Sequence, residues 1–183
     1  SIWAADKSYG TALCDVKDTV EHRILPHIRR VYGGSNFTLV DFGAGDGRFL
    51  AELGKTLGAY ALMAGVDLYR PDVAPWGAYW YQQPMWEPTK RRYDYAISTD
   101  ALEHLPPDMI EATVRNIAAT APHGFLRISL IEDRYGTERG LHLHESVFPS
   151  HVWCRFLGDA GIEITSARVY FNKGDEQAIE VYF

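Results

Sequence analysis

The feature that most constrains this chain is a glycine-rich turn between an apolar run and a helical segment. In VDFGAGDGR, the glycines Gly43, Gly45 and Gly47 follow the strand-forming run FTLVDF at residues 37–42. Residues 48–57 (RFLAELGKTL) then show the apolar spacing of a helix. A turn this tight needs positive backbone dihedral angles and little side-chain bulk. The sequence therefore predicts a strand, a glycine turn and a helix whose unpaired amides face a ligand such as a nucleotide.

The rest of the chain alternates between strand and helix patterns. Helical spacing covers residues 15–32, with Pro26 expected to kink it, as well as residues 107–121 and 150–160. Apolar runs predict strands at 61–67, 78–82, 93–98, 124–131, 162–171 and 178–183, with a polar loop at 132–144. The turn-rich stretch NKGDEQ joins the last two strands as an antiparallel hairpin. We predict an α/β fold, a Rossmann-like doubly wound sheet with helices on both faces.

Length and composition bound the class of protein. The 183 residues, 46% of them hydrophobic, suffice for one core, so we expect a single domain over residues 1–183. The formal net charge of −6 disfavours binding to a phosphate backbone. Cys14 and Cys154 lack a C-x-x-C partner, which argues against a disulfide framework and favours a reducing, cytoplasmic setting. No apolar run approaches the roughly 20 residues that span a bilayer, so no membrane partner is expected.

An acidic residue supports the nucleotide interpretation of the turn. Asp67 ends the second predicted strand, where a carboxylate can accept hydrogen bonds from both ribose hydroxyls, although it can also serve only as a strand-end turn former. A dinucleotide fingerprint starting at Gly43 would place Gly or Ala where Arg48 stands, which disfavours NAD. The chain also lacks the G-x-x-x-x-G-K-S/T loop of phosphate-loop NTPases. A purely structural glycine turn remains the alternative.

Three segments together carry a family resemblance. VDFGAGDG, GVDLY and YDYAISTDALEHL resemble, in order and spacing, the motifs of class I S-adenosylmethionine-dependent methyltransferases of the small-molecule type. The resemblance covers residues 37–183 and leaves 1–34 as an N-terminal helical extension, in which Trp3 and Tyr9 would contribute to a lid. It implies seven strands with the last one antiparallel, S-adenosylmethionine as cofactor and S-adenosylhomocysteine as product.

The resemblance also implies which residues bind the cofactor. Asp41 would help hold its methionine end, the glycine turn would lie under it, and Asp67 would bind the ribose. The loop around Gln82, Gln83 and Trp86 would border the adenine, where the family often has an acidic residue and this chain does not. The implied cofactor-binding set is Asp41, Gly43, Ala44, Gly45, Asp67, Leu68, Gln83 and Thr99.

The acceptor side is expected after the fourth strand. STDALEHLPPD brings Asp100, Glu103 and His104 to the edge where parallel sheets build their sites. These side chains could orient an acceptor hydroxyl or amine or remove its proton, or else Glu103 and His104 stabilise the loop.

A second histidine-rich segment adds candidates. In LHLHESVFPSH, His142 and His144 could form a metal site with Glu145, but the resemblance favours an acceptor contact, and surface histidines are the third possibility. We predict His104, His144 and Asp100 as catalytic residues, with no metal.

The sequence thus predicts methyl transfer to an oxygen or nitrogen of a small-molecule acceptor by in-line displacement. A nucleic-acid methyltransferase is the first alternative, but the expected Asn/Asp-Pro-Pro-aromatic string and Pro-Cys pair are missing, and basic runs are limited to Arg29-Arg30 and residues 90–92. A catalytically inactive, methyltransferase-like binding subunit is the second alternative.

Overall fold

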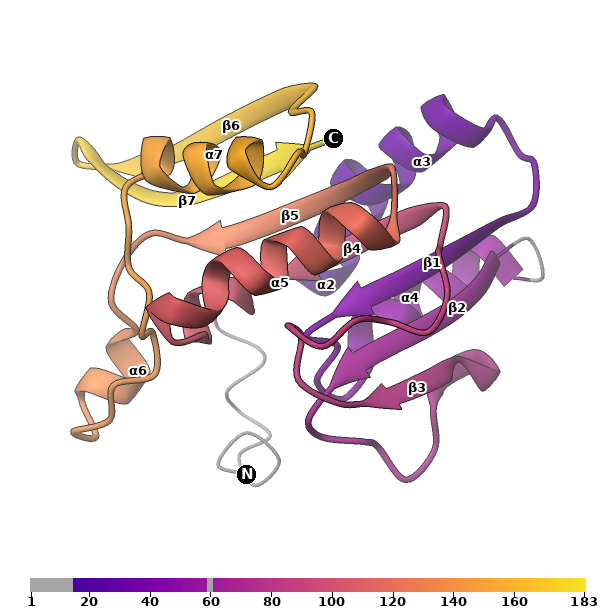
Figure 1. Cartoon of the computed structure of the whole chain (residues 1–183), viewed down its shortest axis with the longest axis horizontal. Coiled ribbons are helices and arrows are strands. Elements are labelled where there is room, and N and C mark those ends of the chain that lie inside the picture. The colour runs from indigo at the N-terminus through magenta and orange to yellow at the C-terminus, as the bar shows by residue number, and fades with distance from the viewer. Residues whose placement is uncertain (1–14, 59–60) are drawn as a thin grey trace.

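The computed structural model describes residues 15–58 and 61–183 and is built around one seven-stranded sheet (Figure 1). The sheet has the order β3-β2-β1-β4-β5-β7-β6. Its strands are β1 (Phe37–Phe42), β2 (Ala61–Asp67), β3 (Tyr79–Gln82), β4 (Tyr95–Thr99), β5 (His123–Ser129), β6 (Ser166–Asn172) and β7 (Asp175–Tyr182). Strands β1 to β5 pair in parallel, and β7 runs antiparallel to both β5 and β6. The predicted α/β class and the antiparallel last strand are confirmed.

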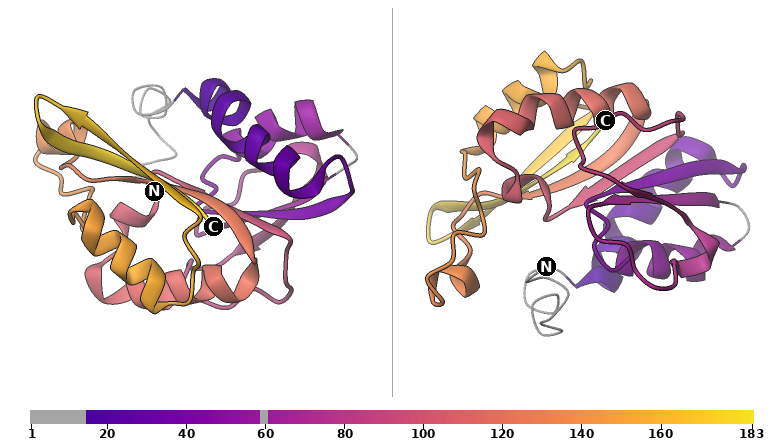
Figure 2. Two further views of the ribbon diagram at one scale, coloured as in Figure 1. Left: turned by 90° about the horizontal axis from the view of Figure 1, so that it is seen from above. Right: turned by 60° about the horizontal axis from the view of Figure 1, so that its bottom comes forward.

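Helices cover both faces of this sheet. They are α2 (Val16–Thr19), η2 (Val20–Ile24), α3 (Leu25–Tyr32), α4 (Arg48–Leu57), η4 (Pro75–Gly77), η5 (Leu102–His104), α5 (Pro107–Thr120), α6 (Arg134–Thr137) and α7 (Ser150–Asp159). Helices α5 and α7 lie on one face, and α3 and α4 lie on the other (Figure 2). Each face has its own apolar core, one including Val114 and Trp153 and the other Ile24 and Leu50.

The predicted interruption near Pro26 is a π-helical turn. Residues Val20–Ile24 form this wider turn, and the Leu25 amide donates to the carbonyl of Val20, five residues back. Pro26 has no amide proton to continue the ordinary helical pattern. The helix therefore adapts just before the proline and continues to Tyr32.

Several predicted boundaries were wrong. The closing hairpin is tighter than predicted, because Lys173 and Gly174, with φ of 52° and 96°, form its turn. Consequently β7 begins at Asp175 instead of residue 178. At the other end of the hairpin, β6 begins at Ser166 instead of residue 162. The polar loop predicted at 132–144 contains the short helix α6.

Two sequence-based expectations fall partly outside the described residues. The expected lid with Trp3 and Tyr9 lies outside the described residues. Of the two cysteines, Cys14 also lies outside them, and Cys154 is a free thiol in α7. Among the helices of residues 15–58 and 61–183, none has the length and apolar character to cross a membrane.

The topology gathers distant segments at one edge of the sheet. Because parallel strands share a direction, the residues that follow β1, β2, β4 and β5 emerge at the same edge. The glycine turn, Asp67, Asp100 and the segment after Ser129 are therefore neighbours in space, although they extend from residue 43 to beyond residue 129 of the sequence.

Candidate functional site

The glycine turn after β1 is fixed by hydrogen bonds to the end of β2. The amides of Gly43 and Ala44 donate to the Val66 carbonyl at 2.8 and 3.2 Å. The φ angles of Gly43, Gly45 and Gly47 are 76°, 56° and 82°, a region that side-chain-bearing residues rarely adopt. The positive dihedral angles predicted from the sequence are confirmed.

The three glycines have different surroundings. A Cβ atom on Gly43 would lie 2.4 Å from the Cβ of Ala101, and one on Gly47 would lie 2.7 Å from Cγ of Pro75. A Cβ atom on Gly45 would meet nothing within 4 Å among the described atoms. Gly43 and Gly47 therefore allow close packing of the protein on itself, whereas Gly45 faces space that a ligand can enter.

Asp67 connects the end of β2 to the glycine turn. Its Oδ2 accepts a hydrogen bond from the Gly45 amide at 2.8 Å, and its Oδ1 accepts one from the Tyr69 amide at 2.7 Å. Burial raises the pKa of Asp67, and the two amide donors oppose that rise. Each carboxylate oxygen has a second lone pair, so this turn-forming role leaves capacity for a ligand hydroxyl.

Asp41 is a buried carboxyl group beside the turn. It is 1% exposed, and its Oδ1 has no hydrogen-bond partner within the described part of the chain. Burial, together with the nearby charge of Asp67, raises the pKa of Asp41 well above its usual value. A buried polar atom of this kind normally has a partner, so Asp41 is suited to hold a polar group of a ligand.

The other residues of the implied cofactor set differ in exposure. Thr99 is buried at the end of β4, while the Leu68 side chain is 66% exposed. The Gln83 side-chain amide donates to the carbonyls of Glu87 and Pro88 at 2.8 and 3.3 Å. The donors of Gln83 are therefore used to shape its own loop.

On the acceptor side, Asp100 follows β4 with φ of 48°, unusual for a residue with a side chain. Its amide donates to the Arg127 carbonyl at 2.9 Å, and its Oδ1 lies 3.7 Å from Arg127 Nε. Burial raises the pKa of Asp100 to about 6, against the opposing effect of the Arg127 charge. Asp100 is thus held by β5, the neighbouring strand.

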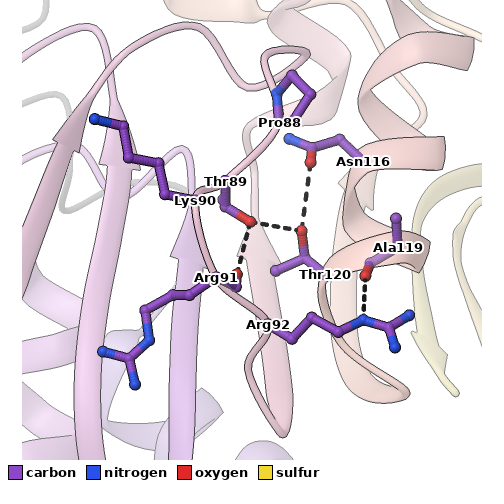
Figure 3. Close-up of a pocket in the computed structure, with 8 residues that line it drawn as sticks. All are labelled: Pro88, Thr89, Lys90, Arg91, Arg92, Asn116, Ala119 and Thr120. Carbon is purple, nitrogen blue, oxygen red and sulfur yellow. Dashed lines mark hydrogen bonds between the residues drawn. The ribbon is translucent and has the colours of Figure 1, made fainter.

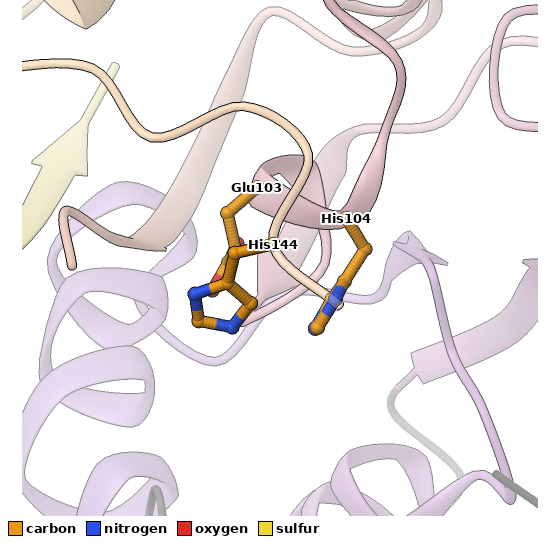
Figure 4. Close-up of side chains that lie close together, drawn as sticks. All are labelled: Glu103, His104 and His144. Atoms are coloured by element: carbon orange, nitrogen blue, oxygen red, sulfur yellow. The ribbon is translucent and has the colours of Figure 1, made fainter. Parts of the chain in front are cut away.

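Glu103, His104 and His144 lie together although forty residues separate the last two (Figure 4). The first two belong to η5, and His144 belongs to the loop before α7. Ser146 joins the two segments, because its amide donates to the Glu103 carbonyl at 2.9 Å and its Oγ donates to the Leu105 carbonyl at 2.6 Å. The ring centroids of His104 and His144 are 4.7 Å apart.

Each of the two imidazole rings is held by a hydrogen bond from its Nδ1 to a backbone carbonyl. Nδ1 of His104 is 2.6 Å from the Leu143 carbonyl, and Nδ1 of His144 is 2.6 Å from the Ile131 carbonyl. Since a carbonyl oxygen only accepts, Nδ1 of each ring carries a proton, which in the neutral ring places the lone pair on Nε2. Burial lowers the pKa of His104 to about 4, so this ring is neutral at pH 7.

Glu103, beside the two histidine rings, is fully buried. Its Oε1 accepts a hydrogen bond from the Ser129 amide at 3.1 Å, and its Oε2 has no partner among the described residues. Burial and the neighbouring Asp100 raise the pKa of Glu103 to about 8. The metal arrangement considered from the sequence is different, because His142 and Glu145 are exposed while His144 is buried.

A separate cavity of about 200 Å³ lies before β4 and against the end of α5 (Figure 3). Residues 88–92, Asn116, Ala119 and Thr120 line it. Thr89 and Thr120 hydrogen-bond to each other at 2.9 Å, and Arg92 Nε donates to the Ala119 carbonyl at 3.1 Å. These groups stabilise the loop, and the cavity lies at the edge of the sheet opposite the glycine turn.

Comparisons with known proteins agree with this fold. A family described as a methyltransferase domain matches residues 15–167. No curated protein matches the chain. Magnesium protoporphyrin IX methyltransferase from Synechocystis, solved with S-adenosylhomocysteine, is 18% identical, with 91% of this chain and 82% of that chain covered and a TM-score of 0.65.

Two further solved structures are similar. The 1,6-didemethyltoxoflavin-N1-methyltransferase from Burkholderia thailandensis is 20% identical, with 96% of this chain and 84% of that chain covered and a TM-score of 0.61. An S-adenosylmethionine-dependent methyltransferase from Clostridium acetobutylicum is 10% identical, with 93% and 92% covered and a TM-score of 0.71. Because the sequence identities of these structures to this chain are low, the similarity shows a shared fold.

Proposed function

Because the chain belongs to the class I S-adenosylmethionine-dependent methyltransferases, we propose that it transfers a methyl group to an oxygen or nitrogen of a small-molecule acceptor by in-line displacement. The observation that carries the proposal is the pairing of an open glycine turn with a buried, partnerless carboxyl oxygen. Gly45 leaves space beside the turn, and Asp41, two residues before the turn, has a buried Oδ1 with no partner in the described chain.

The cofactor-side residues fit S-adenosylmethionine, which supplies a methyl group on a positively charged sulfur that leaves as a neutral thioether. We propose that Asp41 holds the methionine end and that Asp67 accepts hydrogen bonds from the ribose hydroxyls. The backbone of Gly43, Ala44 and Gly45 would lie beneath the ligand. Leu68, Gln83 and Thr99 would complete the pocket. No acid is needed for the leaving group, so alignment of the acceptor is the main contribution of the protein.

Asp100, His104 and His144 are the proposed catalytic residues on the acceptor side. Nε2 of His144 carries a lone pair with no partner in the described chain, so it can accept a proton or fix the acceptor group. Asp100 would orient the acceptor, and the neutral His104 ring would form one wall.

A small acceptor is favoured over a nucleic acid. The net charge of −6 does not suit a phosphate backbone, and the basic residues 90–92 lie away from the glycine turn, at the opposite edge of the sheet. The similar methyltransferases named for protoporphyrin and toxoflavin substrates support the same class. Because both cysteines lack a C-x-x-C partner, we also propose a reducing, cytoplasmic setting.

The decisive experiment compares two valine substitutions by calorimetry with S-adenosylhomocysteine. Gly45→Val places a side chain in the proposed pocket and should weaken binding by at least about 100-fold, roughly 2.7 kcal/mol. Gly33→Val is the matched control, because Gly33 has φ of 59° and open space around it but ends α3, on a face away from the glycine turn. Gly33→Val should bind like the wild type.

Equal affinities of the Gly45→Val variant and the wild type would contradict the pocket assignment. A wild-type chain that binds S-adenosylhomocysteine but methylates no member of a broad small-molecule panel, and methylates RNA instead, would favour the nucleic-acid alternative. Binding with no transfer to either class would favour the inactive binding subunit.

A further inference from the structure

We propose that Glu103, His104 and His144 bind one divalent transition-metal ion of the zinc type. One ligand atom from each residue lies within 4.8 Å of the others. Two imidazole nitrogens and one carboxylate oxygen are a donor set that zinc and ferrous ions accept, whereas magnesium and calcium prefer oxygen ligands. The proposal goes beyond the proposed function: an ion bound by Nε2 of His144 would take the place of the proton-accepting role of that atom, and ion binding can be measured without any acceptor.

The first argument is the orientation of the imidazole rings. A metal-binding histidine usually donates its other ring N–H to a carbonyl or carboxylate, which fixes the tautomer and aims the lone pair at the ion. Both His104 and His144 have this arrangement, since each Nδ1 lies 2.6 Å from a backbone carbonyl. The protein therefore provides the outer contacts of a metal site before any ion binds.

The second argument is two buried atoms that lack partners. Glu103 is 0% exposed and His144 is 4% exposed. Glu103 Oε2 and His144 Nε2 have no hydrogen-bond partner among residues 15–58 and 61–183. A cation between them would be bound by both lone pairs at once and would displace any proton held on Glu103.

The third argument is the electrostatic and structural support around the cluster. Oε1 of Glu103 is held by the Ser129 amide, which leaves Oε2 as the coordinating atom. Arg127 Nε lies 3.7 Å from Asp100 Oδ1, and the Arg127 charge also acts to lower the pKa of Glu103, but burial outweighs that effect. A further positive charge beside Glu103 would therefore favour its carboxylate form. A divalent ion would supply that charge.

The distances require only a small adjustment. Zinc–ligand distances of about 2.0–2.2 Å imply separations of about 3.4 Å between ligands in a tetrahedral shell. The ligand atoms lie within 4.8 Å of one another, so ion binding would draw them closer together through side-chain rotation. His104 is partly exposed, so an open fourth position would be accessible to water or to an acceptor hydroxyl, whose pKa the ion would lower.

The experiment uses the full chain, freed of metal by a chelator and then titrated with Co²⁺, Zn²⁺ and Mg²⁺ separately. We expect one Co²⁺ or Zn²⁺ per chain by elemental analysis, a visible Co²⁺ absorption band and at least about 100-fold weaker binding of Mg²⁺. His144→Ala and Glu103→Gln should each weaken Co²⁺ binding by at least about 10-fold. His142→Ala is the matched control and should bind like the wild type, because His142 is exposed and outside the cluster.

Three outcomes would overturn the proposal. The first is a wild-type chain without stoichiometric Co²⁺ or Zn²⁺, which would mean that water satisfies the buried atoms. The second is Co²⁺ binding that persists in both His144→Ala and Glu103→Gln. The third is Co²⁺ binding that is lost in His142→Ala as well. If a variant fails to fold, the wild-type stoichiometry and spectrum still decide. S-adenosylhomocysteine calorimetry on the same samples tests the proposed function separately.

Discussion

The two halves of the candidate site are built in opposite ways. The cofactor side comes from a contiguous turn whose amides and neighbouring carboxylate are paired with one another, as in the hydrogen bond from Gly45 to Asp67. The acceptor side comes from separate segments, and its buried atoms Glu103 Oε2 and His144 Nε2 have no partner in the described chain. The proposed cofactor side also has one such atom, Asp41 Oδ1, but its glycine turn is held in place by backbone hydrogen bonds to the end of β2. The first half is therefore better preorganised, whereas the second half depends more on what it binds.

The largest expected effect concerns the contact between the halves. Gly43→Ala places a methyl group 2.4 Å from the Cβ of Ala101 at a positive φ, so the free energy of unfolding should fall by about 2–5 kcal/mol in urea denaturation. Gly45→Ala, at a similar φ but in open space, should lower the free energy of unfolding much less. The double variant Gly43→Ala/Ala101→Gly should recover part of the loss. A Gly43→Ala chain as stable as Gly45→Ala would mean that the halves do not touch as described.

The next effect separates binding from turnover. His144→Ala should lower the methyl-transfer rate by about 100-fold, because it removes the Nε2 atom that we propose to contact the acceptor, and should leave S-adenosylhomocysteine affinity within about twofold. His142→Ala, which removes an exposed histidine two residues away, should change neither. If His144→Ala lowered the S-adenosylhomocysteine affinity as much as the methyl-transfer rate, the site would not be divided into a cofactor side and an acceptor side.

A smaller effect tests the cofactor half. Asp67→Ala should weaken S-adenosylhomocysteine binding by about 1.5–3 kcal/mol in calorimetry, because the ribose loses a charged acceptor and the turn loses its bond to Gly45. Asp94→Ala is the control, since Asp94 also accepts a backbone amide, that of Thr38 at 2.7 Å, but lies at the other edge of the sheet. It should lower stability and leave the affinity unchanged.

The smallest effect uses a histidine that belongs to neither half. His27 is buried, its Nδ1 lies 2.6 Å from the Tyr95 hydroxyl, and burial lowers its pKa to about 4. Between pH 6.5 and about 4 the unfolded chain binds a proton that the folded chain does not, so stability should fall as the pH falls through this window. The loss attributable to His27 is about 1–3 kcal/mol. Thermal melts of His27→Gln should show a shallower decline, and identical pH profiles would assign the loss to other groups.

The sequence predicts the geometry of the glycine turn well because adjacent residues determine it. Gly43, Gly45 and Gly47 adopt the positive φ angles expected, and Asp67 lies beside the turn at the end of the next strand. What the sequence could not indicate was that Gly43 is needed for packing on Ala101 while Gly45 faces open space. That distinction depends on how the segment after β4 crosses the turn.

The acceptor half was predicted only as separate candidates. Glu103, His104 and His144 were each identified, but the sequence grouped His144 with the exposed His142 and Glu145. Their true arrangement depends on hydrogen bonds from Ser146 to η5, which join segments about forty residues apart. A side chain that connects two loops leaves no periodic signal in a sequence.

The double use of the Asp67 carboxylate has a consequence for the energetics of the pocket. Because one oxygen accepts a hydrogen bond from the Gly45 amide and the other accepts one from the Tyr69 amide, the backbone on both sides of the proposed ribose-binding carboxylate is fixed before a ligand arrives. Little conformational entropy would then be lost when the cofactor binds, so direct contacts would set its affinity. If the proposal holds, the methylated cofactor and its demethylated product differ in affinity only through the methyl group and its charge, and the product is expected to inhibit the reaction.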